Sequence, residues 1–159
     1  MPIALTATFT ASRHVSLHAT LVSVWGCGVL LCGAPGAGKS SLALALVAQG
    51  QRLVIDDLVL LSRDGTRLIG SGVPGWQGKL LIPEHGLLDV GELYGAKATQ
   101  RAAPIGAAVY LYTGKPTPIY TAQYALPTCV LRRAAPAHMA QTVADWVHRH
   151  GVAAPQAHP

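Results

Sequence analysis

The chain has 159 residues, half of them hydrophobic, which is enough for one compact domain with a buried core and too few to expect two. Its net charge of +5 suits an anionic substrate, but the Lys and Arg residues are scattered along the chain, which argues against a nucleic-acid partner. No apolar run reaches the roughly 20 residues that span a bilayer, and the N-terminus lacks the charged-then-apolar order of a signal peptide. We therefore expect a cytoplasmic protein without a membrane partner.

Only 12% of the residues are charged, so each acidic side chain is informative. Metal-dependent chemistry must draw its carboxylates from seven residues: Asp56, Asp57, Asp64, Glu84, Asp89, Glu92 and Asp145. The three cysteines, Cys27, Cys32 and Cys129, fall in or beside apolar runs and have no ligand spacing in common with a histidine. We expect buried, reduced thiols there.

The first elements along the chain are predicted to form a hairpin that leads into a glycine-rich segment. Residues 1–14 are compatible with an N-terminal arm or an edge strand. Residues 18–24 have the pattern of a strand, residues 26–28 that of a turn, and residues 29–32 that of a short strand buried on both faces of a sheet. The glycine-rich segment follows directly.

That segment, Gly33-Ala34-Pro35-Gly36-Ala37-Gly38-Lys39-Ser40, is a complete match to the phosphate-binding pattern G-x-x-x-x-G-K-[ST]. Glycines let the backbone approach a phosphate closely, and the helix that follows directs the positive end of its dipole to the same point. We expect Lys39 to bridge the β- and γ-phosphates of a nucleotide and the Ser40 hydroxyl to ligate Mg²⁺. The expected nucleotide-binding residues are these eight and Ser41.

A buried helix over residues 40–49, closed by Gly50, and a strand over residues 53–55 come next. Asp56 and Asp57 stand at the carboxyl end of that strand, which we expect to lie beside the strand that leads into the loop. Ligands bind at the carboxyl ends of strands in α/β sheets, so at least one carboxylate should face the phosphates. Successive strand residues point to opposite faces, so we expect one carboxylate to act as base and the other to hold Mg²⁺.

The rest of the chain is predicted to complete a single domain over residues 15–151, followed by a flexible tail over residues 152–159. The expected elements are, in chain order, a hairpin turning at Asp64-Gly65, a long irregular loop over 70–86, strands over 107–111 and between 119 and 131, and an amphipathic helix after Pro136.

His18, the glycine-rich segment and the stretch from Gly50 to Asp57 together resemble the HPr kinase/phosphorylase family, in a short form without the N-terminal domain of longer members. Further similarity is found in Leu93-Tyr94-Gly95-Ala96, and the resemblance covers residues 15–112. Members of this family use ATP to phosphorylate a seryl group of HPr, the phosphocarrier protein of the sugar phosphotransferase system. They can also remove that group by phosphorolysis.

The resemblance implies an α/β fold of the HPr kinase and phosphoenolpyruvate carboxykinase-like type, with a P-loop, a central mixed sheet and flanking helices, and assembly into hexamers. It implies that Asp56 is the general base, with His18 hydrogen-bonded nearby to tune it, and that Lys39 completes the catalytic set. Asp57 and Ser40 would support the metal. HPr would be the partner protein, and ATP and Mg²⁺ would be required.

One segment departs from the family pattern. The family signature is roughly Leu-Glu-Ile/Val-Arg-Gly-x-Gly-Ile, whereas residues 80–87 place Leu81 at the position of the glutamate and Pro83 at that of the arginine. A leucine cannot ligate Mg²⁺ and a proline cannot neutralise phosphate charge. Loss of the phosphorylase reaction and a weakened kinase are the expected consequences, unless Glu84 and His85 substitute.

Three functions therefore stay open from the sequence. The first is an ATP-dependent serine kinase acting on HPr. The second is a nucleotide-binding regulatory module with little catalysis, and the third is a kinase for a small metabolite. Longer members of the family carry a basic residue that approaches the phosphates, but the pair Arg132-Arg133 does not align with it, and we expect this pair to be solvated.

Overall fold

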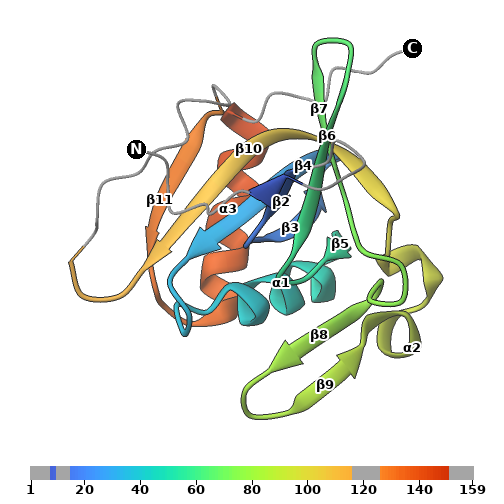
Figure 1. Ribbon diagram of the computed structural model, residues 1–159. Coiled ribbons are helices and arrows are strands. Elements are labelled where there is room, and N and C mark those ends of the chain that lie inside the picture. Colours follow the sequence, from blue (N-terminus) through green and yellow to red (C-terminus); the bar gives the residue numbers. More distant parts are fainter. Residues whose placement is uncertain (1–7, 10–14, 116–125, 151–159) are drawn as a thin grey trace.

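Nine strands form one curled mixed sheet in the computed structural model, which describes residues 8–9, 15–115 and 126–150 (Figure 1). The order along the sheet is β1-β2-β6-β7-β10-β4-β3-β5, and β11 also pairs with β10. The strand bounds are β1 Thr8–Phe9, β2 Val15–Leu17, β3 Thr20–Val24, β4 Cys27–Gly33, β5 Arg52–Ile55, β6 Val59–Asp64, β7 Arg67–Ser71, β10 Ala102–Tyr112 and β11 Thr128–Arg132. Parallel and antiparallel pairs occur together, which confirms the predicted mixed sheet.

Two longer helices cover one face of this sheet (Figure 1). They are α1, Lys39–Ala48, and α3, Pro136–His150, and they pack against each other as well as against the sheet. The predicted C-terminal amphipathic helix is confirmed, because Met139, Val143 and Val147 are buried in that core. Within the described ranges no helix is long and apolar enough to cross a membrane.

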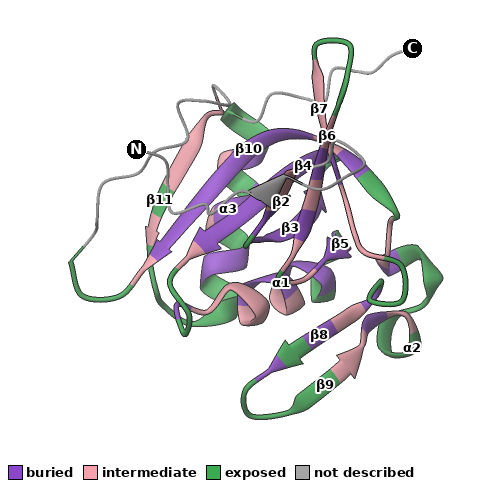
Figure 2. Cartoon of the chain, in the orientation of Figure 1, coloured by how far each residue is buried: buried purple, intermediate pink, exposed green. Residues whose placement is uncertain are grey.

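The core is divided by the alternation of side chains along β4 and β10. Val29 and Leu31 of β4 face the two helices, whereas Leu30 and Cys32 face the opposite side of the sheet. The curled sheet covers this opposite side itself. The long strand β10 links the two parts of the sheet, because its start pairs with β7 and its end pairs with β4 and β11. Figure 2 shows the resulting concentration of buried residues in β3, β4 and β10.

The hairpin that leads into the glycine-rich loop is confirmed, with shifted boundaries. The turn between β3 and β4 consists of Trp25 and Gly26, which both have positive φ angles, 54° and 80°. Two such residues form the tight turn that matches the twist of a two-stranded hairpin. His18 lies in the bend between β2 and β3, so the expected strand over residues 18–24 begins only at Thr20.

The strand that carries the two aspartates does not lie beside the loop strand, contrary to the expectation. β5 pairs with β3, and β3 in turn pairs with β4, both antiparallel. β4 and β5 therefore run in the same direction with β3 between them, and their carboxyl ends meet at the same edge of the sheet. The hairpin that turns after Asp64 is confirmed as β6 and β7.

The irregular loop expected over residues 70–86 contains a hairpin instead. β8, Lys79–Ile82, pairs with β9, Gly86–Asp89, and leads into the short helix α2, Val90–Tyr94, and a 3₁₀ turn over Ala96–Ala98. Asp89 accepts the N–H of Glu92 and lies 3.4 Å from Lys79 Nζ. That N–H and Lys79 hold the pKa of Asp89 below its ordinary value. These contacts fix the open end of the hairpin.

Three further expectations concern the cysteines, the two terminal segments and the last strand. Cys27 and Cys32 are buried free thiols and Cys129 is a partly buried one, and burial raises the pKa of Cys27 to about 11 and of Cys32 to about 12. The arm over residues 1–14, apart from the strand Thr8–Phe9, and the tail over 152–159 lie outside the described residues. Of the strand expected between 119 and 131, β11 accounts for the end.

Candidate active site

The glycine-rich segment forms a loop between β4 and α1 that leaves the start of the helix open. α1 begins at Lys39, and its N-cap residue, Gly38, has a φ of 102°. No side chain caps this end, and no acidic residue lies in the first turn. The N–H of Ala37 donates to the carbonyl of Ala34 at 3.0 Å and tightens the loop. No residue of the helix itself therefore neutralises the positive end of its dipole, as suits an anion site.

The side chain of Lys39 folds back over the loop. Its Nζ donates to the carbonyl of Gly33 at 2.7 Å and lies 3.5 Å from that of Ala34. Both acceptors are neutral carbonyl oxygens, and hydrogen bonds from an ammonium to an anionic oxygen are stronger. A phosphate group in the loop can therefore compete for this ammonium.

A second cation reaches the loop from the far end of the sequence. Arg133 follows β11, and its Nη1 donates to the carbonyl of Gly36 at 2.8 Å. Both arginines are exposed, as expected, but the side chain of Arg133 also lines the same pocket as the loop. The pairing of β11 with β10, next to β4, brings Arg133 to this position.

Arg133→Ala is expected to raise the ATP concentration needed for half-saturation about tenfold. The substitution removes a cation beside the phosphates, and a charged hydrogen bond at a partly exposed site contributes roughly 1–2 kcal/mol. Titration with a fluorescent ATP analogue measures this effect. Arg132→Ala is the matched control, since Arg132 is the neighbouring exposed arginine and does not line the pocket. Equal losses in both variants would contradict a specific role for Arg133.

Asp56 is anchored to the serine of the loop. Ser40 Oγ lies 3.0 and 3.1 Å from its two carboxylate oxygens, and Thr20 Oγ1 donates to it at 2.7 Å. The backbone N–H of Leu81 donates a further bond at 3.2 Å. Three donors from three elements therefore hold this carboxylate beside the loop hydroxyl expected to ligate Mg²⁺.

Asp57 has a different environment. Its carboxylate is largely exposed and lines the pocket, and His18 Nδ1 lies 3.8 Å from its Oδ1. The expected contact between His18 and Asp56 is therefore corrected: the histidine approaches Asp57. The bend between β2 and β3 explains the difference, because it carries His18 out of the strand in which it was expected.

The backbone at Asp57 is in an unfavourable conformation. Its φ is 71°, and apart from Trp25 in the hairpin turn no other non-glycine residue in the described ranges has a positive φ. The N–H of Leu58 donates to the carbonyl of Asp56 at 2.8 Å and closes a three-residue turn around Asp57. Positive φ in such a turn is strained, and strained residues concentrate at functional sites. With this turn, the carboxylate lines the pocket.

Lys39, Asp57 and Arg133 line one open pocket of about 410 Å³, whereas the expected catalytic residues Asp56 and His18 are not among its lining residues. One wall is the loop and the start of α1, and the opposite wall is Leu81, Pro83 and Glu84 of the β8–β9 hairpin. The residues of the loop side are Pro35, Gly36, Ala37, Gly38, Lys39, Ser40 and Ser41, with Asp57 and Arg133 beside them. Of the expected nucleotide-binding residues, Gly33 and Ala34 do not line the pocket. Their carbonyl oxygens instead accept hydrogen bonds from the Lys39 ammonium.

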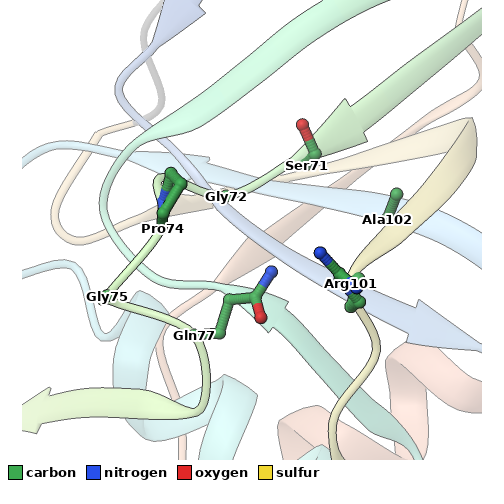
Figure 3. A pocket seen from close by; sticks show the side chains of 7 residues that line it. All are labelled: Ser71, Gly72, Pro74, Gly75, Gln77, Arg101 and Ala102. Carbon is green, nitrogen blue, oxygen red and sulfur yellow. The ribbon is translucent and has the colours of Figure 1, made fainter.

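A second hollow of about 440 Å³ is slightly larger, but its chemistry differs. Ser71, Gln77 and Arg101 stand around it together with Gly72, Pro74, Gly75 and Ala102 (Figure 3). It contains no carboxylate and no helix start, so size alone does not identify the site. The pocket at the glycine-rich loop is the candidate active site.

The donor set fits a magnesium ion held jointly with phosphates. In the described residues no cluster of three or more His, Cys, Asp or Glu side chains could hold a metal. A hydroxyl and a carboxylate, Ser40 and Asp56, lie side by side at the loop, and both supply the hard oxygen atoms that Mg²⁺ prefers. Mg²⁺ in kinases is commonly bound by one or two protein oxygens, waters and the substrate phosphates.

Comparison with known proteins supports the same interpretation. The family model of the HPr Serine kinase C-terminal domain matches residues 10–122. HPr kinase/phosphorylase of Clostridium tetani is 40% identical over 95 residues, which are 60% of this chain and 31% of that protein. The corresponding protein of Streptococcus salivarius is 39% identical over 101 residues, 63% of this chain and 33% of that protein. The chain thus spans about a third of the length of the curated relatives it matches.

A solved structure has the same fold. The HPr(Ser) kinase/phosphatase from Coxiella burnetii superimposes with a TM-score of 0.73 at 26% sequence identity. The match covers 85% of this chain and 89% of that chain. The predicted fold class, an α/β protein of the HPr kinase type with a central mixed sheet and flanking helices, is confirmed.

Proposed function

The chain belongs to the HPr Serine kinase C-terminal domain family, and from this premise we propose that it is an ATP-dependent kinase that phosphorylates a serine of the phosphocarrier protein HPr. One observation carries the proposal. The open phosphate loop, the Lys39 ammonium and the exposed carboxylate of Asp57 converge on a single pocket. Phosphoryl transfer to a hydroxyl needs these three parts: a phosphate cradle, charge neutralisation and a base.

The proposed reaction proceeds in one transfer step. The acceptor hydroxyl lies in line with the γ-phosphorus of ATP, and Asp57 takes its proton as the oxygen bonds to phosphorus. The bond from the γ-phosphorus to the bridging oxygen breaks, and ADP leaves. Lys39, Arg133 and the N–H groups at the start of α1 neutralise the charge on the phosphate oxygens during transfer.

We propose that the roles of the two aspartates are exchanged relative to the sequence expectation. The base has to approach an incoming hydroxyl, and Asp57 is the carboxylate whose oxygens are open to the pocket. Asp56 already accepts bonds from Thr20, Ser40 and Leu81, which suits a fixed metal-side ligand. Mg²⁺ held there with the nucleotide would draw charge from the β- and γ-phosphate oxygens. His18, at 3.8 Å from Asp57, orients the base.

Lys39→Ala is expected to lower phosphoryl transfer to HPr at least a hundredfold, because it removes the lysine ammonium that lines the pocket. Transfer of labelled γ-phosphate from Mg-ATP to purified HPr measures the rate. Lys97→Ala is the control, since this lysine is exposed in the 3₁₀ turn Ala96–Ala98 and does not line the pocket. The proposal fails if the unaltered chain labels HPr no faster than Lys39→Ala does.

A nucleotide-binding regulatory module is the second candidate, and one observation favours it. Leu81 and Pro83 line the wall that faces the loop, at the positions where the family signature carries a glutamate and an arginine. Neither can bind a metal or a phosphate, so the phosphorolysis of phosphorylated HPr is not part of the proposal. ATP binding without any transfer to HPr would favour this second candidate.

Further properties of the protein are proposed on family membership alone. They are a single catalytic domain over residues 15–151, assembly into hexamers and residence in the cytoplasm. Sedimentation of the purified chain tests the hexamer directly. The proposed kinase function does not depend on the hexamer, because the described pocket is formed by one chain.

A further inference from the structure

The β8–β9 hairpin has two faces with different composition. Leu80 and Ile82 are buried against the main core, and Leu88, opposite Leu80, packs there as well. The other face carries Leu81 and Leu87, which are directly opposite each other in the strand pairing. Their exposed fractions are 62% and 53%. The hairpin is thus fixed by its inner face, and its outer leucines contribute little to the core.

This outer face continues into the active site. Leu81 belongs both to the exposed pair and to the lining of the pocket, and Pro83 and Glu84 at the hairpin tip extend the same wall. In Figure 1 the hairpin projects beside α1, away from the main sheet. A protein that brings a hydroxyl to the γ-phosphate from this side touches Leu81 and extends over Leu87, its neighbour on the same face.

The tip adds a charge to this surface. Glu84 is exposed, and it and Asp57 are the carboxylates that line the pocket in the described chain. The phosphates have their cations, Lys39 and Arg133, on the loop side of the pocket. Glu84 on the opposite wall repels phosphate and attracts a cation, so it is suited to a basic group on the acceptor.

We infer that the outer face of the hairpin, formed by Leu81, Leu87 and Glu84, is the docking surface for a protein acceptor. The acceptor presents an apolar side chain to the two leucines and a basic side chain to Glu84, on either side of its hydroxyl. This inference rests on the proposed kinase function and deepens it by naming the chemistry of the acceptor. A small metabolite bound in the pocket does not reach Leu87, because Leu87 is not one of the residues that line the pocket.

The test uses steady-state transfer from Mg-ATP to HPr, with the HPr concentration varied. Leu87→Ser is expected to raise the KM for HPr about tenfold, equivalent to about 1.4 kcal/mol, with kcat within about twofold. Leu93→Ser is the matched control, because Leu93 is as exposed, at 57%, but lies on α2 outside the pocket. Its KM is expected to equal that of the unaltered chain.

Glu84→Lys tests the charge separately. In the unaltered chain the KM for HPr is expected to rise with added salt, because salt screens the attraction. In Glu84→Lys the KM is expected to start several-fold higher and to fall as salt is added. A purely structural role for Glu84 would not reverse the direction of this salt dependence.

The remaining outcomes separate the two claims. An unchanged KM in both variants, with rapid transfer by the unaltered chain, would overturn the docking surface and leave the kinase intact. An unchanged KM together with a smaller assembly in Leu87→Ser would show that a second copy of the chain covers the leucines, which also overturns the inference. No transfer by the unaltered chain would reject the kinase and this surface together.

Discussion

Asp57→Asn is expected to lower the rate of phosphoryl transfer by about 10²–10⁴-fold while ATP binding stays within about twofold of the unaltered chain. The substitution keeps the size of the side chain and removes its ability to take a proton. Asparagine also tolerates the positive φ of 71° at this position, so the strained turn is retained. The loss is therefore assigned to the base rather than to a disturbed loop.

Asp56→Asn provides the comparison that separates the two aspartates. Its carboxylate is bonded to Ser40, so we expect a higher Mg²⁺ concentration for half-maximal transfer and partial recovery at saturating Mg²⁺. Asp57→Asn is expected to show no such recovery. Both variants are measured by transfer of label to HPr over a series of Mg²⁺ concentrations. Recovery in Asp57→Asn and not in Asp56→Asn would mean that the roles are as the family resemblance implied.

Gly28→Ala is expected to lower the free energy of unfolding by about 3 kcal/mol or more. A Cβ at this position would overlap the carbonyl oxygen of Pro104 and lie 3.2 Å from the Cβ of Ala103. Both neighbours belong to β10, which is irregular between Ile105 and Ala107 opposite this point of β4. A backbone oxygen cannot move aside without displacing the strand, so the sheet has to separate locally.

Gly26→Ala is the control in the same hairpin. No atom lies within 4 Å of the Cβ that it adds, but the φ of 80° is unfavourable for alanine. We expect the free energy of unfolding to fall by about 1 kcal/mol, from backbone strain alone. Urea unfolding of both variants measures the difference. Equal losses would contradict a close approach of β4 and β10 as the reason for glycine at position 28.

The local parts of the site were predictable from the sequence because short-range patterns determine them. The loop from Gly33 to Ser40 carries its own turn glycines and is followed by a helix, so its geometry depends on few distant contacts. The hairpin before it consists of two short, mostly apolar runs with glycines between them, which is also a local pattern. Its turn was misplaced because Trp25 adopts a positive φ, which side-chain type alone does not suggest.

The parts that were missed depend on strand order. Thr20, the buried donor to Asp56, was not singled out, although a polar residue at the start of a mostly apolar strand was the available signal. Arg133 reaches Gly36 across 97 positions of sequence, through the pairing of β11 with β10. The partner of His18 was assigned to the wrong aspartate because the expected strand began two residues too early.

The pattern of apolar residues in the sequence did not predict the β8–β9 hairpin either. The stretch from Lys79 to Asp89 has leucines at neighbouring positions and a proline in the middle, so it shows no clean alternation. In the structure these leucines are divided between an inner face that packs on α1 and an outer face toward solvent. The division becomes visible only once the register of the two strands is known.

The most direct test of the central claim is the mass of HPr after incubation with this chain and Mg-ATP, followed by mapping of the modified residue. The proposed function predicts the gain of one phosphoryl group on a serine of HPr, in a reaction that Lys39→Ala and Asp57→Asn do not perform. HPr of unchanged mass, under conditions in which the chain binds ATP, would contradict the kinase and leave a nucleotide-binding module in its place.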